Sequence, residues 1–170
     1  MVLAALAALL AVVLVWLKGN LAAQAPLEML ARRSQEPAAA LASGRPTVVE
    51  FYADWCEACR AMAPAMLDLE GRHRDRLNLV LLNVDNPRWQ PELEGYGVNG
   101  IPHLEFFDSR GRGVGHAIGA RSAADLEALT SALLTEQPLP DLAGVGALST
   151  LVDPARPAQA GTPISPRSHG

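Results

Sequence analysis

The 170-residue chain contains 49% hydrophobic and 19% charged residues, a composition that can supply the buried core of one domain with flanking segments. Its formal net charge is −4. Without a cluster of lysine and arginine it lacks the basic stripe of nucleic-acid-binding proteins, so no nucleic-acid partner is expected. The two cysteines, Cys56 and Cys59, are too few for a disulfide-stapled small protein or a four-cysteine zinc site, and no metal or cofactor is predicted.

The N-terminal segment is strongly apolar, since residues 1–17 contain no polar side chain. As a helix this run would measure about 26 Å, and Trp16 and Lys18 at its end would help it match a hydrocarbon layer of about 30 Å. We therefore expect residues 1–20 to be a transmembrane anchor. A signal peptide cleaved within residues 21–25 is the alternative, although the positive charges that normally precede its apolar region are absent.

Residues 27–136 alternate between helical and strand patterns and are expected to form one folded domain. Helical patterns and capping signals predict helices over residues 27–42, 56–74, 91–96 and 122–135. Runs of β-branched, aliphatic and aromatic residues predict strands over residues 47–52, 77–84, 103–107 and 114–118, the last two forming a hairpin. This order predicts an α/β domain with a mixed sheet. Residues 137–170, rich in Pro, Gly and Ala, are expected to be a flexible tail with a short contact around residues 148–152.

The two cysteines stand where a predicted strand has just ended and a helix begins. At a helix N-terminus the free backbone N–H groups and the helix dipole stabilise a thiolate and lower the pKa of a cysteine. The placement predicts a dithiol site in which the outer Cys56 attacks a disulfide of another protein and the more sheltered Cys59 resolves the mixed disulfide. The alternatives are an inert pair of core cysteines or half of a zinc site.

The sequence around this pair resembles the thioredoxin family. Residues 48–59, VVEFYADWCEAC, resemble the active-site strand and loop, and residues 99–102, NGIP, resemble the family's Gly-Ile-Pro loop. Pro64 matches the proline that kinks the active-site helix, and Gly119 matches the glycine after the last strand. The resemblance covers nearly the whole folded domain and implies a thioredoxin fold, in which helices flank a mixed central sheet.

The resemblance also implies which residues contact a client protein. Pro102 corresponds to the cis-proline that faces the disulfide, and the carbonyl of Ile101 before it can pair with an extended client backbone. A cis bond before proline costs only about 0.5–1 kcal/mol, so a fold can hold it. Trp55 is expected to cover the disulfide and meet partners, and His103 to line the client groove.

Glu50 occupies the position of the family's buried acid beneath the disulfide. Burial is expected to raise the pKa of this carboxyl group, which makes it a candidate proton acceptor for Cys59 and so a catalytic residue. The family pairs that acid with a lysine on the next strand, whereas Leu81 stands at the matching position here.

Three further features narrow the resemblance: the CExCR motif, residues 82–86 (LNVDN) and residues 101–103 (IPH). Together with the N-terminal span they resemble the membrane-anchored thioredoxin-like proteins of cyanobacteria and chloroplast thylakoids. That group implies a role in assembling c-type cytochromes and the cytochrome b6f complex. The implied clients are protein disulfides, including apocytochrome cysteines, and the implied electron donor is a membrane thiol transporter.

The expected activity is reduction of protein disulfides, because the carboxylate of Glu57 opposes a thiolate on Cys56. The resemblance implies a domain on the lumenal or periplasmic side of a thylakoid or cytoplasmic membrane, whereas basic residues after the span weakly favour the cytoplasmic side. Two alternatives stay open. One is an assembly factor or chaperone that grips clients in its groove, and the other is an oxidant or isomerase of the same fold.

Overall fold

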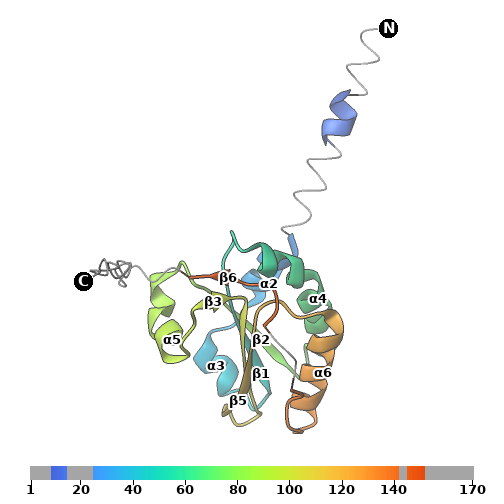
Figure 1. The fold of residues 1–170 in the computed structure, drawn as a ribbon. Coiled ribbons are helices and arrows are strands. Elements are labelled where there is room, and N and C mark those ends of the chain that lie inside the picture. Colours follow the sequence, from blue (N-terminus) through green and yellow to red (C-terminus); the bar gives the residue numbers. More distant parts are fainter. Residues whose placement is uncertain (1–8, 15–24, 142–144, 152–170) are drawn as a thin grey trace, which may run out of the picture.

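The structure is a computed structural model that describes residues 9–14, 25–141 and 145–151. Its centre is a four-stranded sheet in the order β2–β1–β4–β5 (Figure 1). The strands are β1 (Thr47–Tyr52), β2 (Asn78–Asn83), β4 (His103–Phe107) and β5 (Gly113–Ile118). Strands β1 and β2 are parallel, while β4 runs antiparallel to both β1 and β5. The mixed sheet and the hairpin predicted from the sequence are confirmed.

Helices lie on both faces of this sheet. They are α2 (Ala25–Arg33), α3 (Pro37–Leu41), α4 (Glu57–His73), α5 (Gln90–Gly95) and α6 (Ala123–Leu134), with a 3₁₀ helix η1 at Pro87–Trp89. Helices α4 and α6 pack together over one face, and α3 and α5 lie over the other (Figure 1). Helix α2 packs against α4 and β2. Because both faces are covered, all six residues of β1 are buried.

The core forms around the central strand β1. Phe51 on β1, Phe106 on β4 and Met66 on α4 are among the largest fully buried side chains. Burying a side chain of this kind contributes about 1.5–3 kcal/mol, so the shared core stabilises the packing of β1 and α4. The link between them, where Cys56 lies, is thereby held at the carboxyl end of the central strand.

The prediction of one helix over residues 27–42 is wrong, because the structure divides it into α2 and α3. Pro37 lacks a backbone N–H, and its ring disfavours a helical conformation at Glu36, which is extended (φ −62°, ψ 133°). The break places Ser34 beside the outer edge of β2, where its hydroxyl accepts a hydrogen bond from the Leu81 N–H at 2.8 Å. The interruption therefore satisfies a backbone donor that the sheet leaves unpaired.

The C-terminal part of the domain begins with the predicted cap. The Ser122 hydroxyl accepts from the Asp125 N–H and the Asp125 side chain accepts from the Ser122 N–H, so α6 has a complete capping box. Further on, β6 (Ser149–Thr150) pairs antiparallel with the two-residue strand β3 (Gly100–Ile101). This pairing lies within the expected contact around residues 148–152, whereas residues 142–144 and 152–170 of the expected tail lie outside the described residues.

The expected membrane anchor falls largely outside the described part of the chain. Residues 9–14 are helical, but residues 1–8 and 15–20 are not among those the structure describes. Within the described ranges, no helix combines the length and the apolar character needed to cross a membrane.

Candidate active site

The two cysteines form a disulfide at the start of α4, with their Cα atoms 5.3 Å apart. Cys56 is the N-cap of the helix, and its Sγ accepts a hydrogen bond from the Cys59 N–H at 3.1 Å. When the disulfide is reduced, this donor and the positive end of the helix dipole lie where negative charge develops on the Cys56 sulfur. The local sequence therefore builds a site that favours a thiolate at Cys56.

Neither cysteine is accessible to solvent in the oxidised protein. Cys56 and Cys59 both have 0% of their surface exposed. The expectation that Cys56 is the more exposed of the two therefore does not hold in this state. Disulfide exchange requires one sulfur to contact another, so a client reaches Cys56 only after some neighbouring segment moves.

The loop that faces the disulfide contains the expected cis-proline. The Ile101–Pro102 peptide bond is cis, and both residues are buried. The carbonyl oxygen of Ile101 lies 3.7 Å from the Cys56 Sγ. The Pro102 carbonyl accepts a hydrogen bond from the Gly119 N–H at 2.8 Å, which ties this loop to the end of β5. The structure thus brings Ile101 and Pro102 to the reactive sulfur.

Trp55 is the exposed member of the site, with 49% of its surface accessible. Its indole N–H donates a hydrogen bond to the Asp85 carboxylate at 2.9 Å, which fixes the ring next to Cys56. Sequence reasoning missed Asp85, which looks only like a turn residue after a strand. A usable signal exists, because β1 and β2 are parallel and the residues that follow them meet at one edge of the sheet.

Glu50 is fully buried in the middle of β1, and neither of its carboxylate oxygens has a hydrogen-bond partner among the described residues. Burial raises the pKa of this carboxyl group from 4.5 to about 8, because the charged form loses its hydration. Leu81 is its cross-strand neighbour on β2, so an apolar side chain stands where a cation would offset that cost.

The direction of the Glu50 side chain follows from the pleat of β1. Its neighbour Phe51 packs against Tyr96, at the end of α5, with ring centroids 5.9 Å apart. Successive side chains of a strand point to opposite faces, so Glu50 faces the side that α4 and α6 cover. Helix α4 carries Cys59 in its first turn. Cys59 and the unpaired carboxyl group of Glu50 therefore lie on the same side of the sheet.

His103 lies on the other face of the sheet. Its ring packs edge-on against Phe51 at 5.8 Å, and its Nε2 lies 2.7 Å from the Glu105 carboxylate. Only 3% of the residue is exposed. Although His103 follows the cis-proline directly, the structure does not bring its ring together with Cys56 and Trp55 at the surface.

Comparisons with known proteins agree with this geometry. The family model described as Thioredoxin matches residues 30–132. A thiol:disulfide interchange protein TxlA homolog from Synechocystis sp. is 42% identical over 144 residues, which cover 85% of this chain and 78% of that protein. The thiol:disulfide interchange protein TxlA of Synechococcus elongatus is 39% identical over 147 residues, or 86% of this chain and 76% of that protein.

A chloroplast protein is similar over a shorter part of its own length. The chloroplastic thioredoxin-like protein HCF164 of Oryza sativa is 42% identical over 132 residues, which cover 77% of this chain. The match covers 49% of that protein, so this chain spans about half the length of the chloroplast relative.

Proposed function

The chain belongs to the thioredoxin family and is a protein-disulfide oxidoreductase, and we propose that it acts as a membrane-anchored reductant of protein disulfides. The observation that carries the disulfide exchange is the hydrogen bond from the Cys59 N–H to the Cys56 sulfur at the N-terminus of α4. It places a donor and the helix dipole at the atom that must become a nucleophile. Residues 27–136 would form the catalytic domain, and residues 1–20 the anchor.

The proposed cycle begins with the reduced protein. The Cys56 thiolate attacks one sulfur of a client disulfide, which forms a mixed disulfide and releases the first client sulfur as a thiolate. Cys59 then loses its proton and attacks the Cys56 sulfur, which closes the Cys56–Cys59 disulfide and releases the second client thiolate. Two electrons pass to the client, and a thiol donor restores the dithiol.

Glu50 is the proposed proton acceptor for Cys59. It lies on the face of β1 that α4 covers and carries the unpaired carboxyl group whose pKa burial raises to about 8. A base is most effective when its pKa lies near the working pH, so this value suits proton transfer from a thiol in neutral to mildly alkaline conditions.

The reducing direction rests on charge beside the nucleophile. Glu57 is an exposed carboxylate in the first turn of α4, next to Cys56, and it destabilises a neighbouring thiolate. Arg60 opposes it only in part, since its guanidinium is held on the Asp54 carbonyl at 2.5 Å. A less stable thiolate favours the disulfide form of the protein and so makes the dithiol the better reductant.

The location and clients are proposed from the apolar N-terminal segment and from the relatives. Cyanobacterial thiol:disulfide interchange proteins and a chloroplastic thioredoxin-like protein support a photosynthetic membrane as the site of action. We place the domain on the lumenal or periplasmic side, with cysteine pairs of exported proteins such as apocytochrome c as clients and a membrane thiol transporter as the electron donor.

The test measures both the potential and the intermediate. In a redox buffer the Cys56–Cys59 couple should have a potential near or below about −270 mV, and a value near −120 mV would mark an oxidant instead. With a disulfide-bonded apocytochrome c peptide, the reduced wild type should release free thiols. Cys59→Ser should accumulate the mixed disulfide, and Cys56→Ser should do neither. Client maturation that survives in Cys56→Ser/Cys59→Ser would contradict the proposal and favour a client-binding assembly factor.

A further inference from the structure

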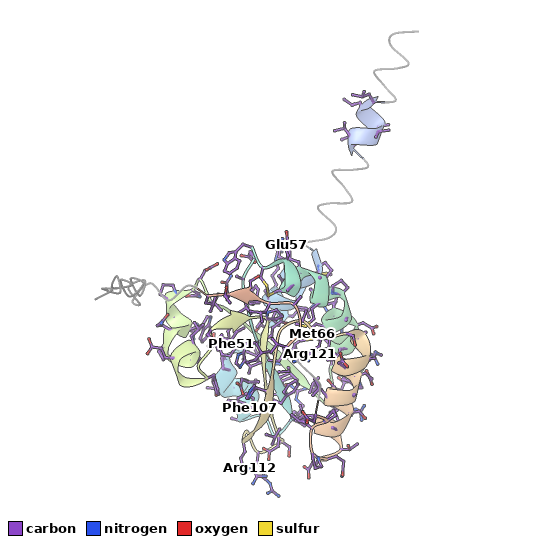
Figure 2. All side chains as sticks on the ribbon, viewed as in Figure 1. Phe51, Glu57, Met66, Phe107, Arg112 and Arg121 are labelled. Atoms are coloured by element: carbon purple, nitrogen blue, oxygen red, sulfur yellow. A yellow bond between two sulfur atoms is a disulfide. The ribbon has the colours of Figure 1, made fainter. Side chains whose placement is uncertain are left out.

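Residues 145–151, which we call the strap, lie along the strand that borders the disulfide. Strap strand β6 pairs antiparallel with β3, and the Leu151 N–H donates to the Asn99 carbonyl at 2.9 Å. Figure 1 shows the short β6 arrow beside β3, at the end of the molecule where Figure 2 labels Glu57. Because the Ile101 carbonyl oxygen lies 3.7 Å from the Cys56 sulfur, the strap pairs with the backbone that contacts the reactive atom.

The other end of the strap is bound to the loop after β5. The Gly146 N–H donates to the Ile118 carbonyl at 3.2 Å, and the Ala120 N–H donates to the Ala147 carbonyl at 2.7 Å. The strap therefore bridges the two loops that meet at the cis-proline, since the Pro102 carbonyl is itself bound by the Gly119 N–H.

Glycines allow the strap to approach both loops closely. A Cβ on Gly146 would lie 2.0 Å from the Ala120 carbonyl oxygen, and a Cβ on Gly119 would lie 2.3 Å from the Gly146 carbonyl oxygen. On the other loop, a Cβ on Gly100 would lie 2.8 Å from the Leu148 side chain. The two backbone contacts at the loop after β5 are possible only where a side chain is absent, and at β3 the absence of a Cβ on Gly100 leaves room for Leu148.

The strap is nevertheless weakly buried. Val145 is 62% exposed and Leu148 is 38% exposed, and Ala147 and Thr150 are also exposed. Leu151 is partly buried against the core. Backbone hydrogen bonds contribute much of the remaining attachment, and segments with few buried apolar contacts open at low cost. Within the described residues, β3 pairs with no strand other than β6, so an opened strap leaves the backbone of β3 as a free edge. A free edge accepts any extended chain of suitable geometry.

We propose that the strap occupies the edge on which an extended protein client binds, and that a client must displace the strap to reach Cys56. This inference rests on the proposed function and adds the regulation of its site. It accounts for a reactive disulfide that is fully buried while the neighbouring Trp55 is exposed. Because the strap is part of the same chain, its effective concentration at the edge is high. The smaller the fraction of molecules whose site is open, the lower the apparent affinity for clients.

The residues of the strap also indicate which client segment would fit the edge of β3. Such a client is an extended polypeptide segment with a very small residue where Gly146 lies, beside the loop after β5. Two residues further on, an aliphatic side chain would take the place of Leu148 beside Gly100.

The test opens the strap by adding one methyl group. Gly146→Ala places a Cβ against the Ala120 carbonyl oxygen, whereas the matched control Gly95→Ala adds the same group where nothing lies within 4 Å. The first measurement is the rate at which dithiothreitol reduces the Cys56–Cys59 disulfide in the full chain. We expect an increase of about tenfold or more for Gly146→Ala and no change for Gly95→Ala. Reduction of a protein client should accelerate in parallel.

A second variant acts at the opposite end of the strap. Leu151→Pro removes the N–H that bonds to the Asn99 carbonyl, replaces a side chain that packs against the core, and leaves the loop after β5 untouched. Its expected effect has the same direction. The urea unfolding midpoint of each variant is measured, and rates are compared only where it equals that of the wild type, so that a general loss of folding is not mistaken for an open strap. If one variant fails to fold, the other carries the test.

The outcomes separate the two proposals. Wild-type rates with dithiothreitol in both strap variants would overturn the strap proposal, whatever the activity on proteins. A faster reaction with dithiothreitol in chains that reduce no protein disulfide would support the strap and overturn the proposed function. A faster reaction of the disulfide with dithiothreitol, together with faster reduction of a protein client, supports both proposals.

Discussion

The two faces of the central sheet each bury a carboxyl group, and they treat it in opposite ways. On the face that α5 covers, Glu105 is 9% exposed and its carboxylate lies 2.7 Å from the His103 ring. On the face that α4 covers, Glu50 is fully buried and has no hydrogen-bond partner among the described residues. Burying a polar group without a hydrogen-bond partner costs free energy. The paired Glu105 is therefore compatible with a stable fold, whereas the unpaired Glu50 lowers its stability.

The difference between the two carboxyl groups comes from their immediate partners. Strands β1 and β4 are neighbours, and Glu50 lies opposite Leu104 while Glu105 lies opposite Val49. What distinguishes them is one partner, a histidine in one case and Leu81 in the other. The unpaired acid is the one on the side of α4, the helix that carries Cys59, and in the proposed cycle Cys59 must lose a proton.

The largest expected effect is on stability after Glu50→Leu. Since the folded pKa of Glu50 is about 8 and its ordinary value is 4.5, the folded protein keeps this proton while the unfolded chain loses it. The contribution of Glu50 to stability should therefore be largest below pH 4.5 and be lost as pH rises to about 8. At pH 9, Glu50→Leu should be more stable than wild type by about 3–5 kcal/mol, and by clearly less at pH 5. Urea unfolding at both pH values measures this, and a variant with the wild-type pH dependence would contradict the assignment.

The next effect concerns the second step of catalysis. Glu50→Gln cannot accept a proton, so resolution of the mixed disulfide by Cys59 should slow by about tenfold to a hundredfold at pH 8 to 9. The wild-type rate should rise as pH passes about 8, and the rate of the variant should not follow that rise. Rapid-quench detection of the mixed disulfide measures the step. Glu105→Gln is the control, and if it slowed the step equally the two faces would not differ in function.

A smaller effect should come from breaking the paired acid. Glu105→Leu leaves the buried Nε2 of His103 without its partner and should destabilise the protein by about 1–3 kcal/mol. Glu105→Gln keeps an acceptor and should cost less than about 1 kcal/mol. Urea midpoints of the two variants test the difference, and equal losses would show that the pair is not what stabilises this face.

The smallest effect extends the comparison to an exposed carboxylate. Asp85→Ala removes the acceptor of the Trp55 indole at the surface, where a hydrogen bond contributes only about 0.5–1.5 kcal/mol. Stability should change by no more than this, while KM for a protein client should rise severalfold because the ring next to Cys56 is no longer oriented. Asp85→Asn retains an acceptor and should restore most of the lost affinity; a KM equal to that of Asp85→Ala would argue against this orienting role.

Features that depend on neighbouring residues were predictable from the sequence. Local patterns predicted three features that the structure confirms: the strand that ends at Tyr52, the cap at Ser122 and the start of α4 at Cys56. The one local error is the helix over residues 27–42, where the apolar periodicity outweighed the signal of Pro37. Resemblance to a family supplied the cis bond before Pro102, which no local pattern indicates.

Features that depend on distant segments were not predictable in the same way. The Trp55–Asp85 hydrogen bond joins residues that follow two different strands. The ring of His103 was expected in the client groove, but the pleat of β4 turns it toward Phe51 and Glu105. Its position after the cis-proline indicated proximity to the site without indicating the face of the sheet.

By itself the sequence determined the chemistry of this protein, because a CxxC pair at the junction of a buried strand and a helix needs only the residues around it to favour a thiolate. Only the tertiary structure decided how accessible the cysteines are and what surrounds them. It buried both sulfurs, left Glu50 without a charged partner among the residues that the structure describes, and laid residues 145–151 against β3. Each of these depends on segments far apart in the chain, whose approach is set by packing and strand pairing rather than by local pattern.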